Sequence, residues 1–181
     1  MNALSVTDKG RRIALSFDDL LNYHGPGYPG GVAHAFKAME RAFPLLAGGE
    51  PPERDEIHIA TPFSGPGARD AFEMTTRAVT RGRFTLAPEL ARSDVTPAWR
   101  GRYVFRFTHR GATVAVMVRD GLVREEFLAL GQRAQRETLS PEDEARLSWL
   151  KDEMANRLLS LPADQVYDVI EALAIPGGSG A

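Results

Sequence analysis

The sequence predicts an α+β fold, in which a mainly antiparallel sheet is packed by helices within a single domain. Strand-like and helix-like patterns are interspersed, and the clearest strands, residues 102–108 and 112–119, are joined by a short turn and therefore run antiparallel. The chain has 181 residues, 43% of them hydrophobic, which suffices for one domain with a substantial core. We expect a core domain over residues 16–172, preceded by an N-terminal arm over 1–15 and followed by a flexible tail over 173–181.

The first quarter of the chain predicts a loose arm followed by two helices. A short strand is expected inside the arm at residues 12–15, and Ser16 is suited to cap a short helix. A glycine-rich loop over 22–31 then leads into a helix from about residue 30 to 46, although Pro44 fits poorly in its last turn. The apolar residues of this helix are spaced four, three, four and three apart, as on one helix face: Val32, Phe36, Met39, Phe43 and Leu46.

The middle of the chain predicts one helix between two short strands. Residues 56–60 alternate in polarity, as expected for a strand. A flexible turn over 62–67 precedes a helical pattern over 68–80, and residues 83–86 have the character of a second strand.

The last part of the chain predicts a hairpin and two further helices. The segment His109–Gly111 is the expected hairpin turn, and residues 122–136 are expected to be helical. A strong helix start follows at 140–143, where a serine cap precedes a proline and an acidic residue in the first turn. A proline stops this helix, and we expect a short turn over 164–170 and disorder over 175–181.

Composition excludes several classes of function. The net charge of −2 and the pI of about 6.1 give no electrostatic basis for binding nucleic acid or an anionic membrane surface. The chain has no cysteine, which excludes disulfides, thiolate catalysis and cysteine-based zinc or iron–sulfur sites. The N-terminus lacks the apolar core of a signal peptide, and no apolar run is long enough to span a membrane. We therefore expect a cytoplasmic protein.

Two glycine-rich loops are the candidate binding elements. The segments His24–Gly31 and Ser64–Gly67 each precede a predicted helix, whose first turn presents backbone N–H groups and the positive end of the helix dipole. Both loops are suited to an anion such as a phosphate or carboxylate, yet neither matches the phosphate-loop or dinucleotide-binding pattern. The alternative is that both are tight connections without a ligand.

His24 is the best single candidate for chemistry. A loop histidine can act as a general base, a hydrogen-bond donor or a ligand, while the alternative is a histidine that stabilises the end of the preceding short helix. Asp70 lies in the first turn of the helix after Gly67 and either complements the dipole of that helix or orients His24 across a shared site.

The other histidines have weaker claims to function. His34 is expected on the face of its helix opposite the apolar residues, where it faces solvent or an interface. His58 is expected to point away from its apolar neighbours in a structural role, and His109 to be a turn residue. A metal site needs three or four convergent ligands, and His24 with Asp70 supplies only two, so no metal is assigned.

The segment from His24 to Gly30, followed by a helix, resembles the His-Gly-His-x-Cys-Pro-Gly segment of the FmdE family, which is named after a component of formylmethanofuran dehydrogenase. Residues 67–70 resemble the family's Cys-x-x-Asp block at the start of a helix, and residues 158–169 are similar to the end of the family's core domain. The likeness covers about residues 16–170. It implies an α+β core that pairs as a homodimer.

The departures from the family pattern concern the metal ligands. The family's second histidine corresponds to Pro26, and its two cysteines correspond to Tyr28 and Gly67. The resemblance therefore implies a family member whose original metal site is lost. A phenol in place of a thiol suits a polar organic ligand better than a transition metal, although the Tyr28 ring is equally suited to fill the space of the absent ion.

These observations lead to a main hypothesis and two alternatives. The chain is expected to be a homodimer that binds a small organic or anionic ligand near His24, with Asp70 as its orienting partner and Tyr28 as a proton donor or ligand contact. Ligand-binding residues are expected in both glycine loops: Gly25, Gly30, Ser64, Gly65 and Gly67. The alternatives are a metalloprotein that uses His24 and Asp70 with His58 or His34, and a non-catalytic scaffold in which the old site is packed. No cofactor is indicated.

Overall fold

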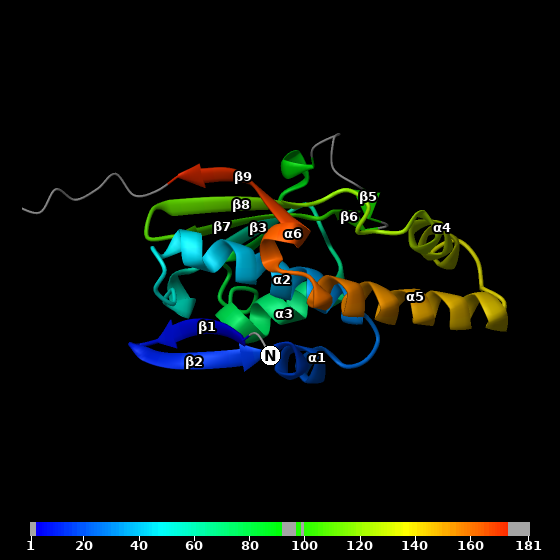
Figure 1. Ribbon diagram of the computed structural model, residues 1–181, viewed down its shortest axis with the longest axis horizontal. Helices are drawn as coiled ribbons and strands as arrows, with labels where there is room; N and C mark the ends of the chain where they lie inside the picture. Colours follow the sequence, from blue (N-terminus) through cyan, green and yellow to red (C-terminus); the bar gives the residue numbers. More distant parts are fainter. Residues whose placement is uncertain (1–2, 92–96, 99, 174–181) are drawn as a thin grey trace, which may run out of the picture.

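The computed structural model describes residues 3–91, 97–98 and 100–173, and it has the expected α+β architecture. A five-stranded sheet lies on one side, a layer of helices lies beneath it, and an N-terminal hairpin lies on the far side of the helices (Figure 1). Among the described residues, no helix is both long and apolar enough to cross a lipid bilayer.

The N-terminal segment is a regular β-hairpin, where the sequence predicted a loose arm with one short strand. Strand β1 (Ala3–Asp8) pairs antiparallel with β2 (Arg11–Ser16) across a two-residue turn in which Lys9 and Gly10 both have positive φ. Leu4 and Val6 are buried, and the Glu53 carboxylate accepts hydrogen bonds from the Lys9 N–H and the Thr7 hydroxyl, both at 3.0 Å. The alternating polarity of β1 was the signal for this strand.

Two helices follow the hairpin directly. Helix α1 (Phe17–His24) begins with a capping box, in which the Ser16 and Asp19 side chains each accept a hydrogen bond from the other residue's backbone N–H. Helix α2 (Pro29–Leu46) is longer and contains Pro44 in its last turn. It contacts the sheet, the hairpin, α1, α3 (Pro66–Thr76) and α5 (Pro141–Ser160) on its different sides. It is therefore the central helix of the fold and is buried almost all round.

The sheet has the strand order β4-β3-β7-β8-β9, in which β9 (Tyr167–Leu173) is an edge strand. Strands β3 (His58–Thr61) and β4 (Phe84–Leu86) are parallel, and helix α3 (Pro66–Thr76) connects them. The other neighbours pair antiparallel, including β7 (Val104–His109) with β8 (Ala112–Val118), so the sheet is mainly antiparallel.

Strand β9 (Tyr167–Leu173) stands where the sequence predicted a short turn. It follows a single helical turn, α6 (Ala163–Val166), and pairs with β8 along the edge of the sheet. The register shifts between Ala115 and Val116, so Val169 pairs with Val116 while Ile170 is an extra residue. This irregularity interrupts the alternation of polarity that identifies strands.

The C-terminal helices extend beyond the body of the molecule (Figure 1). Helix α4 (Glu125–Ala134) packs on α5 (Pro141–Ser160), which begins where Ser140 accepts the backbone N–H of Asp143. The short elements are η1 (Arg54–Glu56), η2 (Pro88–Leu90), β5 (Pro97–Ala98) and β6 (Gly101–Arg102). Most of the expected tail, residues 174–181, lies outside the described residues.

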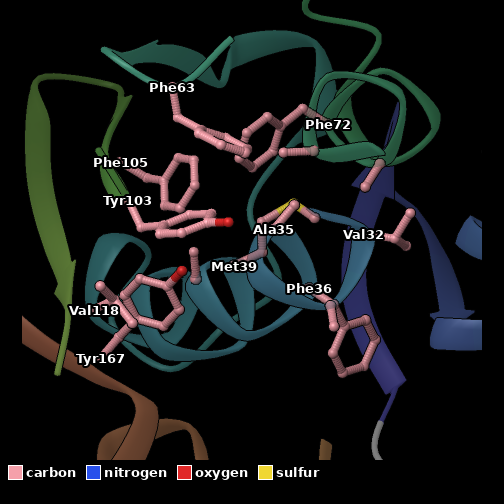
Figure 2. Packing of buried hydrophobic residues seen from close by; sticks show 14 of the residues in the cluster. Val32, Ala35, Phe36, Met39, Phe63, Phe72, Tyr103, Phe105, Val118 and Tyr167 are labelled. Carbon is pink, nitrogen blue, oxygen red and sulfur yellow. The ribbon is translucent and has the colours of Figure 1, made fainter. Parts of the chain in front are cut away.

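An aromatic cluster fills the core between the sheet and the helices (Figure 2). The Phe72 and Phe105 rings meet edge to face at 5.3 Å between centroids, and the Phe63 ring lies 4.5 Å from that of Tyr103. The Tyr103 and Tyr167 hydroxyls also point into this region (Figure 2). Buried hydroxyls require polar partners. The partner of one of these two hydroxyls is a histidine of α2.

Candidate functional site

His24 and Asp70 meet although 46 residues separate them along the chain. His24 is the last residue of α1 and Asp70 lies in α3, and the His24 Nδ1 atom is 2.8 Å from Asp70 Oδ2. The His24 side chain is 8% exposed and that of Asp70 33% exposed. The structure thus brings together the imidazole and the carboxylate on which the sequence-based hypothesis depends.

This contact determines which nitrogen of the neutral His24 imidazole carries the hydrogen. An ionised Asp70 carboxylate can only accept a hydrogen bond, so Nδ1 carries the hydrogen and Nε2 is left with its lone pair when the ring is neutral. The Nε2 atom is buried and has no hydrogen-bond partner among the described residues. A carboxylate-oriented imidazole with a free Nε2 can accept a proton or a hydrogen bond from a ligand.

The close approach of two helix starts positions this pair. A Cβ atom added at Gly67 would lie 2.6 Å from the Tyr28 carbonyl oxygen and 3.0 Å from the Val32 nitrogen. A Cβ at Gly31 would lie 3.3 Å from the Ala68 nitrogen. Glycine at these positions therefore allows the first turns of α2 and α3 to touch, which brings Asp70 within reach of α1.

Tyr28 lies beside His24 at the start of α2. The two rings are 6.0 Å apart between centroids and tilted by 49°. The Tyr28 ring also faces the Lys151 ammonium, whose Nζ atom lies 4.4 Å from the ring centroid. The same Nζ atom donates a hydrogen bond to the Gly27 carbonyl at 3.2 Å. The phenol thus contacts both an imidazole and a cation.

A small hollow lies between the two glycine loops, as the ligand hypothesis requires, but it is narrow. Its volume is about 20 Å³, room for one or two water-sized groups, and we refer to it as the glycine-loop hollow. Its walls come from both loops and from the sheet, α4 and α5: Tyr28, Gly30, Gly31, Gly65, Pro66, Gly67, Arg100, Tyr103, Phe127, Lys151 and Met154. His24 and Asp70 are not among these residues and lie beyond Tyr28.

Two of the five expected ligand-binding residues have other surroundings. Gly25 ends α1 with φ of 88° and donates its N–H to the Leu21 carbonyl at 2.7 Å. Ser64 is exposed, and its N–H and hydroxyl both bond to the Arg100 carbonyl. Gly30, Gly65 and Gly67 do line the hollow.

The residues proposed as rewired metal ligands do not converge. Within the described ranges, no group of three or more histidine and acidic side chains lies close enough to hold a metal ion. His58 is exposed on β3, pointing away from its buried neighbours as the alternation predicted, and His34 is buried in the core. The His24–Asp70 pair therefore offers two ligands from one chain.

His34 was predicted to face solvent or an interface, and this is wrong. It is fully buried, its Nδ1 atom is 2.7 Å from the Tyr167 hydroxyl, and its ring stacks on Tyr103 at 3.7 Å between centroids. Burial, with a smaller effect from the Arg157 charge, lowers the pKa of His34 to about 3. The prediction assumed a helix with one buried face, whereas α2 is surrounded.

His109 is also not the turn residue that the sequence predicted. The turn is formed by Arg110 and Gly111, both with positive φ, and His109 is the last residue of β7. It is 5% exposed, and its Nε2 accepts the Glu53 N–H at 3.3 Å. Burial lowers the pKa of His109. The hydrogen bond from Glu53 anchors the chain beside the hairpin.

Sequence reasoning missed two cations at the hollow, Arg100 and Lys151. For Lys151 there was a signal, because it occurs three residues before Met154 and four after Leu147, on the apolar stripe of α5. A charge at such a position is costly unless it serves packing or a ligand. No comparable periodicity identifies Arg100.

Comparison of the chain with protein-family models and with curated protein sequences gives no match.

Proposed function

We propose that this protein is a divergent FmdE-like homodimer of the cytoplasm that binds a small organic or anionic ligand beside His24. The contact between His24 Nδ1 and Asp70 Oδ2 carries this proposal. These are the two polar residues of the family pattern that this sequence keeps, and their arrangement leaves a buried, unpartnered Nε2 for a ligand. In a catalytic version, His24 is the acid/base, Asp70 orients it and Tyr28 donates a proton.

Ligand binding on this proposal displaces the Tyr28 side chain. The hollow holds only one or two water-sized groups, and the ring of Tyr28 both lines it and lies 6.0 Å from the ring of His24. Movement of this half-buried ring would join the hollow to the His24 Nε2 atom. The cost is loss of the cation–π contact with Lys151, which is modest at a partly exposed site.

The test combines a ligand screen with variants of the pair. A panel of polar organic acids, alcohols and amines is screened by thermal shift, and the affinity of each hit is measured by calorimetry. We expect His24→Ala to weaken binding by about 10- to 100-fold, since it removes a hydrogen bond to a buried polar group. His58→Ala is the matched control because His58 is exposed and distant in sequence.

Folding and assembly are measured in parallel. Circular dichroism must show that His24→Ala is folded, and His24→Gln is the substitute where it is not. Light scattering should give twice the chain mass of 19.8 kDa for the proposed dimer. Hits that bind His24→Ala and wild type equally would refute the ligand site, and a monomer would refute the homodimer.

The narrowness of the hollow favours a second candidate, a non-catalytic scaffold in which the old site is packed. Tyr28 then fills the space of a lost ligand, and its contact with Lys151 closes the site. The Tyr28→Ala variant distinguishes the two candidate functions. A ligand-binding protein should still bind its hits, with an altered affinity, whereas a scaffold should lose stability without binding any of them.

A further inference from the structure

We infer that the ligand of this site carries a carboxylate, which Arg100 and Lys151 bind in the glycine-loop hollow. This inference rests on the proposed function and names its ligand class. Its basis is a hollow lined by two cations and, among the described residues of its wall, by no acidic side chain.

Lys151 has lost part of its hydration without gaining a carboxylate. Burial and the Arg100 charge lower the pKa of Lys151, and Asp152 offsets this only in part. The contacts of its Nζ atom are with the Gly27 carbonyl and the Tyr28 ring, which are both neutral. A bound anion would relieve the repulsion between the two cations.

Arg100 is the second cation of the hollow. Its Nε atom is buried without a hydrogen-bond partner among the described residues, while its backbone carbonyl accepts the Ser64 N–H. A guanidinium whose Nε–H is unused is suited to a planar carboxylate, which Arg side chains often bind through two parallel hydrogen bonds.

This absence of acidic partners contrasts with the surface of the molecule. Most cationic side chains there pair with a carboxylate within 4 Å, including these pairs: Arg81–Asp55, Arg110–Glu56, Arg119–Asp168, Arg124–Glu153, Arg133–Glu137 and Arg146–Glu126. Among the described residues, carboxylate partners of cations are thus widespread, but none lines the hollow, where a ligand can provide one.

The remaining wall suits an anion as well. Gly30, Gly31 and Gly67 expose backbone rather than side chains, and they lie in the first turns of α2 and α3. These helix starts add positive potential to that of the two cations. They strengthen a site that the cations and the hollow define.

Size selects the class of anion. A hollow of about 20 Å³ favours the flat, two-oxygen head of a carboxylate over the larger tetrahedral phosphate or sulfate. Lys151 also lines a wider cleft of about 570 Å³, but the wall of that cleft includes Glu137 and Glu144, so the hollow is the better place for an anion.

The chain offers a direct reporter, because it contains only three lysines: Lys9, Lys37 and Lys151. Reductive methylation with ¹³C-formaldehyde gives each lysine amine an NMR signal and keeps its charge. Sodium acetate is titrated at constant ionic strength. We expect a saturable shift of the Lys151 signal with a Kd in the millimolar range, together with a rise of its pKa. Phosphate and sulfate should give no saturation.

Variants and controls complete the test on unmethylated protein, with thermal shift by acetate as the readout. Arg100→Gln and Lys151→Met should each weaken the acetate effect at least about ten-fold. Lys9→Met is the matched control, since it removes an exposed lysine at the hairpin turn and should change nothing.

The outcomes separate this inference from the proposed function. Failure of acetate to saturate the Lys151 signal, or equal shifts of the Lys9 and Lys151 signals, would overturn the inference. Saturation by phosphate instead of acetate would show that the assigned class is wrong. If a neutral hit of the screen still binds in a His24-dependent way, the proposed function survives that failure; if no compound binds, both are lost.

Discussion

Acidification should destabilise this protein through one buried histidine, His34. Its neutral ring is enclosed by the core, stacked on Tyr103 and bonded to the Tyr167 hydroxyl, and its pKa is lowered to about 3 from the ordinary value of 6.5. Since the lowered pKa belongs to the folded state, the stabilising contribution is complete above pH 6.5. It is lost as the pH falls towards 3, because the unfolded state then binds the proton alone.

The magnitude follows from the two pKa values. Each pH unit between them contributes about 1.4 kcal/mol, so His34 alone should remove about 3 kcal/mol of stability between pH 7.5 and pH 4.5. The perturbation is the double variant His34→Phe/Tyr167→Phe, which removes both partners of the hydrogen bond and leaves neither hydroxyl nor imidazole unpaired. The free energy of unfolding of this variant should fall by about 3 kcal/mol less than that of wild type over this pH range.

The assay is urea denaturation followed by circular dichroism at several pH values from 7.5 to 4.5, with the slope m checked for constancy. His58→Gln is the matched control, because His58 is exposed on the surface of β3. Equal pH dependence of wild type and the double variant would refute the assignment of a buried, neutral His34.

Three further predictions follow from the site and the hairpin. Gly67→Ala should lower the free energy of unfolding, measured by urea denaturation, by about 1–3 kcal/mol, because the added Cβ would lie 2.6 Å from a carbonyl oxygen of the adjoining helix start. Gly27→Ala is the control: its Cβ would have open space around it, and it should cost less than about 1 kcal/mol. Asp70→Ala should release His24 from the Nδ1–H tautomer, and unchanged imidazole ¹⁵N shifts would contradict the contact. Glu53→Ala should destabilise the fold by about 1–3 kcal/mol, because it removes the carboxylate that accepts hydrogen bonds from the hairpin turn. A smaller loss of stability in thermal or urea unfolding would show that solvent replaces the carboxylate.

The sequence was most informative where local patterns decide the structure. The serine caps at residues 16 and 140, the apolar spacing of α2 and the alternation of β7 and β8 each depend on neighbouring residues, and those elements appear where expected. Two motif blocks 46 residues apart also pointed to His24 and Asp70, whose side chains meet.

What the sequence could not provide depends on tertiary surroundings. His34 has a polar side chain on a helix that is enclosed from several directions, and no periodicity describes enclosure. Strand β9 was missed because a bulge interrupts its alternation. Arg100 and Lys151 come from different parts of the fold, and their shared hollow exists only once α5 has packed against the two glycine loops.

The central position of α2 has a consequence for how the molecule opens. Its backbone amides lie between the sheet, the hairpin and the other helices, so no partial loosening of one layer exposes them to solvent. They should be among the slowest to exchange with deuterium, at a rate set by complete unfolding. The outlying α4, which packs chiefly on α5, should exchange far sooner, and the wall of the hollow at Phe127 would then open while the rest of the fold stays intact.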